Sequence, residues 1–320
     1  MRLFDAYIFV DWSANNSRKI GKDSIWITEA IAQGRRLRLP LPDNGCLNAP
    51  TRAIAVDLIR ARLAEHMLRE RRVLVCFDFA YGYPDCGEFR KLAPNSLEFA
   101  QSVAALLQDQ DDNRSNRFEV ADHFNAIVND PSREGPFWGH PSSWKNQPLR
   151  YLKSTKPKNW CSRTELAEFR IVENRLRSAG MRPFSAWQLF GNGSVGSQAL
   201  LGLPRVIELK ELFSEASAIW PFETGWTKSF SDEIRIVHAE FWPGLIDIDE
   251  SLHRIRDAAQ VKSCALWAAT ADASGHLSEY FDPMASDDPD RDRAEIEGWI
   301  LGFSAIRSMQ RSVRKGIKEA

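Results

Sequence analysis

The sequence predicts an α/β protein built on a mixed β-sheet, in which a three-strand meander is followed by a helix and then by parallel strands. Apolar runs bounded by turn residues indicate buried strands at 7–11, 73–78 and 234–240, and each run ends in a carboxylate. An amphipathic pattern over 51–70 places a helix directly before the second run, which is the order of a parallel crossover. Between the fourth and fifth strands we predict a large, mainly helical insertion.

The three-strand meander occupies the first part of the chain. After the strand at 7–11, the segments SIWITEAI (24–31) and RRLRLPL (35–41) indicate two more strands. Strands this close in sequence pair most simply in antiparallel fashion, because a parallel connection needs a long crossover.

The helix over 51–70 provides such a crossover. Its apolar residues fall at helical spacing, and Thr51, which follows Pro50, suits the N-cap position. The helix leads directly into the strand that ends at Asp78. That strand should therefore lie parallel to the first one, so we expect Asp11 and Asp78 at the same edge of the sheet.

The rest of the chain is mainly helical in pattern. Helices are predicted at 95–108, at 117–128, at 164–178 with Gly180 as a C-terminal cap, after the Gly-rich turn at 191–198 with an interruption near Pro204, at 252–273 and at 291–318. We therefore expect a sheet core at 1–84 and 232–275, a mainly helical insertion at 85–231 and a helical extension at 276–320.

Composition narrows the function classes. The 320 residues carry a net charge of -1, so any contact with nucleic acid requires a local basic patch. The five cysteines are scattered and form no CxxC pair, which argues against a disulfide framework or a zinc site. No apolar run approaches the roughly 20 residues of a membrane span, and the chain begins in a predicted strand instead of a signal peptide. We expect a cytoplasmic protein without a membrane partner.

Four short motifs contain the acids at the ends of the predicted elements. VDWSA contains Asp11, CFDFAYGYP contains Asp78, AEFWP contains Glu240 and RDAAQVKSCALWAA contains Asp257. Together with GNGSVGSQ, EGWILG and the order of elements, they resemble a bacterial family of uncharacterised proteins with a predicted RNase H-like domain, within the RNase H-like and resolvase-like nuclease superfamily. The resemblance covers most of the chain. Some members carry labels that link them to molybdopterin or cobalamin biosynthesis.

The resemblance implies an RNase H-like sheet whose acids converge on a divalent metal. Asp11, Asp78, Glu240 and Asp257 are then the expected metal ligands and catalytic residues, with Mg²⁺ or Mn²⁺ as the cofactor. Metal-assisted phosphoryl transfer needs several hard oxygen ligands on rigid elements. For each acid alone, the alternative is that it caps a turn or pairs with an arginine. Two acids at the ends of neighbouring parallel strands favour the metal site.

A local excess of positive charge indicates a segment that binds nucleic acid. Residues 140–163 contain six Lys or Arg and no Asp or Glu, with aromatic residues interleaved. Cations that neutralise phosphates beside aromatics that stack on bases are typical of a nucleic-acid-binding loop, although a solvated basic loop has the same composition. The expected substrate-binding residues are Ser13, Trp144, Lys145, Arg150, Lys153, Lys156, Lys158, Trp160 and Arg163.

Two further patterns are weaker. The glycines of the turn at 191–198 could cradle a phosphate, but the turn lacks the Lys-Ser/Thr of a P-loop, and Ser194 or Ser197 capping the next helix explains it better. His238 lies two residues before Glu240 and shares its strand face. It could join the acids or serve as a core histidine.

Two function classes remain open. The first is a divalent-metal-dependent nuclease or related phosphoryl-transfer hydrolase. The second is a catalytically silent or nucleotide-binding relative of the actin-like ATPases, in which the first-strand Asp and the following loop hold Mg·ATP. DWSANNSRK, which contains Ser13, is a loop of that general kind. A second, repeated lobe would distinguish the actin-like class, and this chain is too short and too helical for one.

Overall fold

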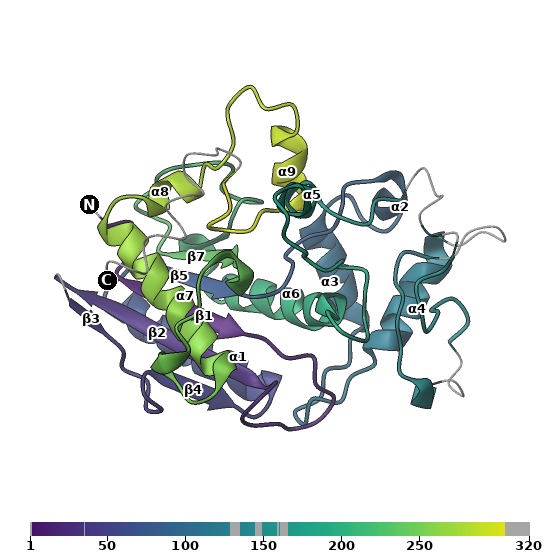
Figure 1. Cartoon of the computed structure of the whole chain (residues 1–320), viewed down its shortest axis with the longest axis horizontal. Coiled ribbons are helices and arrows are strands. Elements are labelled where there is room, and N and C mark those ends of the chain that lie inside the picture. Colours follow the sequence, from purple (N-terminus) through teal and green to yellow (C-terminus); the bar gives the residue numbers. More distant parts are fainter. Residues whose placement is uncertain are drawn as a thin grey trace.

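The computed structural model describes residues 2–34, 36–128, 135–144, 149–158, 160 and 166–304 (Figure 1). Its centre is a seven-stranded sheet of order β3-β2-β1-β5-β7-β6, with β4 paired to β2 as well. The predicted α/β class with a mixed sheet is confirmed. The strands are β1 (Ala6–Asp11), β2 (Ile25–Gln33), β3 (Arg36–Arg38), β4 (Cys46–Ala49), β5 (Val73–Phe77), β6 (Ser217–Ile219) and β7 (Ile236–Glu240).

Helices cover both faces of the sheet. α7 packs on one face against β1 and β2, while α1 and α6 pack on the other (Figure 1). Among the described residues, no helix is both long enough and apolar enough to cross a membrane. The helices are α1 (Arg52–Leu68), α2 (Gly87–Arg90), α3 (Ser96–Leu106), α4 (Arg117–Val128), α5 (Ile171–Ser178), α6 (Val195–Glu211), α7 (Arg256–Ala273), α8 (Leu277–Tyr280) and α9 (Arg291–Glu297).

Alternate residues of β1 point to the two covered faces. Tyr7 and Phe9 join the core beneath α7, whereas Ile8 and Val10 join the core beneath α1 and α6. Because neither face of the central strands reaches solvent, β1 and β5 are apolar at almost every position. This explains why both strands read as continuous apolar runs in the sequence.

The predicted crossover is confirmed. α1 begins directly after Thr51, whose hydroxyl accepts a hydrogen bond from the backbone N–H of Ile54 at 3.3 Å. β1 and β5 then pair in parallel, with Val10 opposite Phe77, and β7 pairs with the other side of β5. The C-terminal ends of β1, β5 and β7 therefore meet at one edge of the sheet.

Part of the predicted insertion belongs to the sheet. α6 contributes Leu203 and Val206 to the core that contains β1 and β5, and the three-residue β6 pairs in parallel with β7. The predicted interruption near Pro204 is wrong, because buried residues on both sides of the proline hold one continuous helix against the sheet. β6 was not predicted, since three residues are too few to show a strand period.

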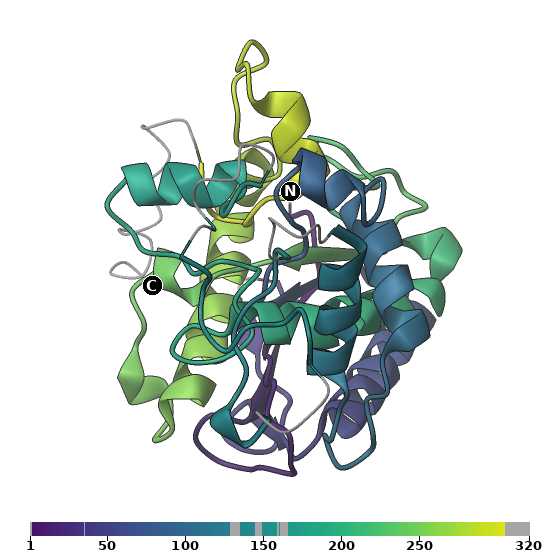
Figure 2. The ribbon, with the colours of Figure 1, turned by 90° about the vertical axis from the view of Figure 1, so that its right-hand side faces the viewer.

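The remainder of the predicted insertion forms a helical lobe beside the sheet. α3, α4 and the described parts of 135–160 share a core of aromatic residues that includes Phe99, Phe124 and Trp187. Figure 2 views the molecule from the side of this lobe, with α4 in front of the sheet. Of the basic segment, the described residues Leu152 and Trp160 belong to the core of this lobe.

Several predicted boundaries need correction. The helix expected at 164–178 begins at Ile171, and the strand expected at 35–41 covers only 36–38. The terminal helix expected at 291–318 ends at Glu297, because Gly298 adopts a φ of 82° and Trp299 turns into the core. Residues 305–318 of that prediction lie outside the described residues.

Substitution of Gly202 tests how closely α6 approaches the sheet. A Cβ at this position would overlap the ring of Phe79, which is 1% exposed. Gly202→Ala should therefore destabilise the protein by about 1–3 kcal/mol in urea denaturation, the usual cost of overpacking, although alanine is the better helix former. Adding Phe79→Leu should recover part of the loss. A Gly202→Ala protein as stable as the wild type would show that the helix lies farther from the sheet.

Candidate functional site

Asp11 and Asp78 lie side by side where β1 and β5 end. Val10 is paired with Phe77 in the parallel ladder, so the residues that follow fall at the same level of the sheet. The backbone N–H of Trp12 donates to Asp78 Oδ1 at 2.7 Å, and the two carboxyl groups share a hydrogen bond. The prediction that both acids lie at one edge of the sheet is confirmed.

The pKa of each carboxyl group in this pair is raised. Burial raises the pKa of Asp11 well above its usual range, and the negative charges of Asp78 and Asp257 raise it further. Burial raises the pKa of Asp78 to about 7, against the opposing effect of the hydrogen bond from Trp12. Within the described part of the chain, neither carboxyl group has an ion-pair partner. Both carboxyl groups of the pair therefore have raised pKa values and lack a compensating positive charge among the described residues.

The acid pair lines a cavity of about 340 Å³, a volume within the range of small-molecule sites. Gln198 of α6 and Gln260 of α7 contribute amide groups to the same cavity, and Glu240 contributes the end of β7. Asp11 and Asp78 are both partly exposed, so solvent reaches them. We refer to this space as the acid cavity.

Asp257 approaches the pair from the first turn of α7. Its Oδ2 atom accepts a hydrogen bond from the backbone N–H of Asp23 at 2.6 Å, and its charge acts on Asp11. Over the described ranges, however, no three Asp, Glu, His or Cys side chains are close enough together to hold a metal ion. The four acids predicted from the sequence therefore do not form a single ligand set.

Glu240 is engaged by a buried arginine. Arg170 donates to both carboxylate oxygens of Glu240, at 2.7 and 2.8 Å, and the backbone N–H of Tyr81 donates to Oε2 at 2.9 Å. Arg170 also pairs with Glu173 at 2.8 Å, and none of these three charged side chains is more than 5% exposed. Glu240 therefore pairs with an arginine, which was the alternative to metal binding for each acid. This geometry does not support its predicted role as a metal ligand.

Sequence reasoning missed Arg170, although two signals pointed to it. The arginine lies between Phe169 and Ile171, so a charge interrupts an apolar stretch at the start of a helix. Glu173 follows three residues later, and its carboxylate accepts the Arg170 backbone N–H at 2.8 Å, as in a capping box. The partner on β7 is 70 residues away in the chain and could not be identified from spacing.

Arg170→Met should destabilise the protein by about 3–5 kcal/mol, because it leaves Glu240 and Glu173 buried without a partner. The matched control is Arg60→Met, which removes an arginine that is 51% exposed and pairs with Asp57 at 2.6 Å. That loss should be about 1 kcal/mol or less, since exposed ion pairs contribute little. Urea denaturation measures both, and equal losses would contradict the assignment of Arg170 as the buried anchor.

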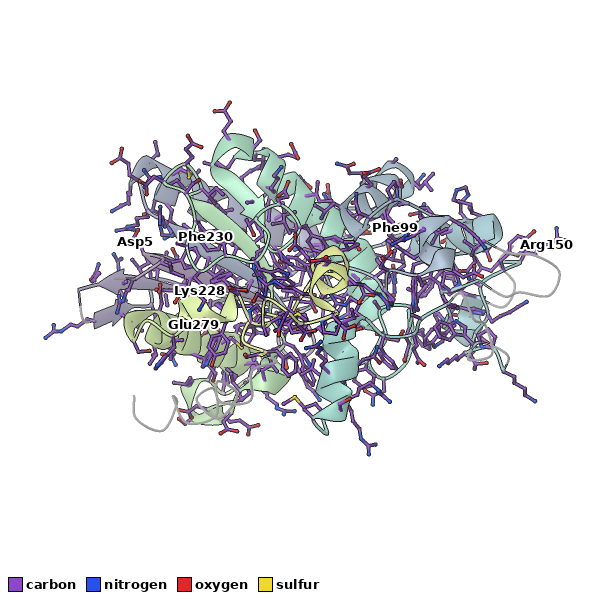
Figure 3. The ribbon with its side chains drawn as sticks, turned by 90° about the horizontal axis from the view of Figure 1, so that it is seen from above. Asp5, Phe99, Arg150, Lys228, Phe230 and Glu279 are labelled. Carbon is purple, nitrogen blue, oxygen red and sulfur yellow. The ribbon has the colours of Figure 1, made fainter. Side chains whose placement is uncertain are left out.

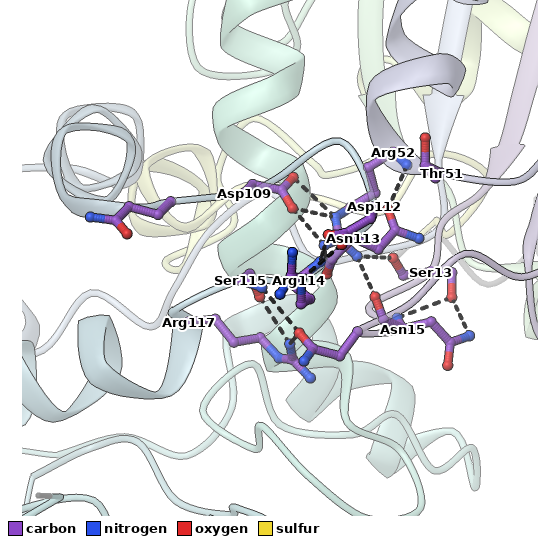
Figure 4. Close-up of polar contacts among 12 residues, drawn as sticks. Ser13, Asn15, Thr51, Arg52, Asp109, Asp112, Asn113, Arg114, Ser115 and Arg117 are labelled. Atoms are coloured by element: carbon purple, nitrogen blue, oxygen red, sulfur yellow. Dashed lines mark hydrogen bonds and ion pairs between the residues drawn. The ribbon is translucent and has the colours of Figure 1, made fainter. Parts of the chain in front are cut away.

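Ser13 lies in the loop after β1, and the buried side chain of Arg52 donates hydrogen bonds to the backbone of this loop (Figure 4). Arg52 donates to Ser13 O at 3.2 Å and to Asn15 O at 2.8 Å, and pairs with Asp109 at 2.5 Å. The Ser13 hydroxyl donates to Asp23 O at 3.4 Å and accepts a hydrogen bond from the Asn15 N–H at 3.3 Å. In this structure Ser13 therefore maintains the shape of the loop.

Trp160 of the basic segment is buried in the lobe, and Trp144 is half-buried against it. Trp160 is 2% exposed and donates from Nε1 to Pro136 O at 3.1 Å. The ring of Trp144 meets the ring of Phe118 edge-on, with centroids 4.9 Å apart. The predicted stacking of bases on these two tryptophans is therefore not supported, because both rings already have protein neighbours.

Most of the described cations of the segment are exposed. Lys156 pairs with Glu168 at 2.6 Å and lies over the ring of Trp160, whereas Lys153 and Lys158 are exposed. Arg150 extends from the end of the lobe farthest from Asp5 and Phe230 (Figure 3). The predicted residues Lys145 and Arg163 lie outside the described residues.

The two weaker patterns have structural roles here. In the Gly-rich turn, the N–H of Gly196 donates to Gln188 O at 2.9 Å, and the N–H of Ser197 donates to Ser194 O at 3.1 Å, so these amides are occupied. Ser194 is the N-cap residue of α6 but makes no side-chain cap bond. His238 contacts Ser217 Oγ at 3.1 Å in the interior, and burial lowers its pKa to about 3, as for a core histidine.

No protein-family model, curated protein or solved structure matches the chain. Its function is therefore inferred from its residues and from the geometry of the acid cavity.

Asp11→Asn should change how stability depends on pH when no metal is present. The pKa of Asp78 is about 7 in the folded protein and near 4 when unfolded, so the folded state binds more protons in this range. Stability contributed by the pair is therefore lost as the pH rises from about 4 to 7. Because the variant removes one acid, its melting temperature in EDTA should fall less between pH 5 and pH 8 than that of the wild type.

Asp57→Asn is the control for this measurement, since Asp57 is 63% exposed in a surface pair with Arg60. It should follow the wild type at every pH. Parallel melting curves for Asp11→Asn and the wild type across pH 5 to 8 would contradict the raised pKa values of the pair.

Proposed function

We propose that this chain is a divalent-metal-dependent hydrolase that cleaves phosphodiester bonds of nucleic acid. The Asp11–Asp78 pair carries the proposal, since two carboxyl groups share a hydrogen bond beside a cavity and have no positive partner among the described residues. The negative charge of Asp78 raises the pKa of Asp11, and burial raises the pKa of both groups. A divalent cation is the partner that would allow both groups to ionise.

The strand order supports our inference that the fold is RNase H-like. β2 pairs with β1 and with β3 in antiparallel fashion, and the crossover through α1 then places β5 parallel to β1. This order puts the first-strand acid at the centre of the sheet edge, as the sequence resemblance implies. α7 packs across β1 and β2 and brings Asp257 toward the same edge.

Asp11 and Asp78 suit Mg²⁺ or Mn²⁺ as the ligands that the protein supplies. Mg²⁺ often binds proteins through one or two carboxylates and completes its shell with water and substrate phosphate, so a pair is sufficient. Bound there, the cation would lower the pKa of a water nucleophile and stabilise negative charge on the reacting phosphate. Asp257 adds a third negative charge nearby, held in place by the N–H of Asp23.

The other polar groups of the acid cavity would position the substrate. Gln198 is fixed by a hydrogen bond from Nε2 to Trp12 O at 2.6 Å, and Gln260 lies three residues after Asp257 on α7. Amide N–H groups donate readily to phosphate oxygens. Glu240 would act indirectly, because its ion pair with Arg170 fixes the end of β7 in the cavity wall.

The actin-like alternative receives less support from the loop after β1. A loop that cradles ATP phosphates presents free backbone N–H groups. Here the Trp12 N–H donates to Asp78 and the Asn15 N–H donates to Ser13. We therefore favour phosphodiester hydrolysis over nucleotide binding.

We also propose nucleic acid as the partner and the cytoplasm as the compartment. The exposed Lys153 and Lys158 place positive charge on the helical lobe, where a strand that enters the acid cavity could extend. Cys76 and Cys264 are buried free thiols, as expected in a reducing compartment.

The wild-type protein should hydrolyse a labelled oligonucleotide, single- or double-stranded, in Mg²⁺ or Mn²⁺ and not in EDTA. Asp11→Asn and Asp78→Asn keep the side-chain shape but remove a charged ligand, so each should lower the rate by several orders of magnitude. Asp57→Asn should cleave like the wild type. Calorimetric titration of Mn²⁺ should give heat with the wild type and little with the two site variants. Equal Mn²⁺ heats, or full cleavage in EDTA, would overturn the proposal.

A further inference from the structure

A second hollow adjoins the acid cavity. It has a volume of about 600 Å³, and the segment Pro183–Phe184 lines both spaces. The two spaces are therefore neighbours that share one wall. We call the second space the arginine hollow, because Arg177 and Arg182 belong to its lining.

The side chain of Phe184 on the shared wall is unusually exposed for an aromatic residue. Its exposed fraction is 46%. Its ring lies against Gly193 in the Gly-rich turn, where a Cβ would overlap the ring and where φ is 78°. A Cβ on Gly196 would likewise overlap Ala186 O. The glycines of this turn therefore allow the turn to pack closely against Phe184 and Ala186, and Gly193 lines the acid cavity beside Phe184.

The arginine hollow carries positive charge. Arg177 and Arg182 are exposed, and among the described residues neither forms an ion pair. Arg177 lies with its guanidinium 4.4 Å from the ring centroid of Phe169. The acid in this hollow, Glu168, is already paired with Lys156 at 2.6 Å. The two neighbouring spaces thus have opposite charge, negative around Asp11 and Asp78 and positive around the arginines.

We propose that the arginine hollow is a subsite for the nucleotide next to the bond that is cleaved in a single-stranded nucleic acid. The base stacks on the exposed ring of Phe184, and the adjoining phosphate contacts Arg182. This inference rests on the proposed function and extends it, because it names where the strand is held. Stacking on an aromatic ring together with neutralisation of phosphate by arginine is how proteins bind single strands without reading their sequence.

The packed state of the basic segment strengthens this assignment. Trp160 is buried, so it offers no ring to a base, and Trp144 is half-buried with its ring against Phe118. Phe184 does offer one, and it lies on the wall of the acid cavity itself. The acid cavity alone would repel a phosphate backbone in the absence of metal, so a neighbouring positive site is needed to hold the strand.

The test is the binding of two fluorescein-labelled eight-residue probes, an oligodeoxythymidylate and an oligouridylate, to the full chain. Anisotropy is measured in EDTA, where hydrolysis is not expected. Phe184→Ala should weaken the binding of at least one probe by about 5- to 100-fold, the usual effect of losing one stacked base. Arg182→Gln should reduce the slope of log K against log salt by roughly 0.7, one phosphate contact on a single strand.

Two matched controls accompany these variants. Phe190→Ala removes an aromatic side chain that is 47% exposed and lines neither space, and Arg36→Gln removes an exposed arginine on β3. Both should bind like the wild type. Phe184→Trp should keep or increase the affinity, because it retains a stacking surface.

The outcomes separate this inference from the proposed function. The subsite is wrong if Phe184→Ala binds the probes as tightly as Phe190→Ala, or if the wild type binds neither probe. An exposed ring that contacts a protein partner instead would give that result. If cleavage that depends on Asp11 is still observed in that case, the subsite is wrong and the proposed function stands. If probe binding depends on Phe184 but no metal-dependent cleavage is observed, the subsite is supported and the proposed nuclease activity is wrong.

Discussion

Negative charge at one edge of the sheet is the constraint on which the rest of the structure depends. β1, β5 and β7 all end there, and each delivers an acid. A buried charge without a partner is costly, so every one of these acids needs compensation. Glu240 receives it from Arg170. Among the described residues Asp11 and Asp78 have no such partner, and both carboxyl groups have raised pKa values instead.

The arginine at this edge also joins segments that are far apart in the sequence. Arg170 donates to Glu297 O at 3.4 Å, and the Glu297 carboxylate accepts the N–H groups of Ile171 at 2.5 Å and of Asp85 at 2.8 Å. The start of α5, the end of β7, the segment after β5 and the end of α9 are thereby held together. The protein's own contacts therefore fix these walls of the acid cavity.

The elements that the sequence predicted well are those with a local cause. Long apolar runs and a capped amphipathic helix were sufficient to place Asp11 and Asp78 together, because a parallel crossover leaves little choice of topology. The partner of Glu240 depends on a tertiary contact that no spacing encodes. Trp160 was misjudged for a related reason, since an aromatic residue in a basic segment looks the same whether its ring faces solvent or the core.

The edge strands of the sheet have a consequence for how copies of this chain can meet. β3 and β6 contain three residues each and β4, which pairs with β2 beside β3, contains four. β3 carries its arginines, Arg36 and Arg38, on the exposed side. Strand-to-strand addition needs a long run of unpaired backbone groups, and short edges with charged side chains discourage it. Concentrated solutions of the protein should therefore resist growth into extended sheets, and self-association would have to proceed through side-chain surfaces.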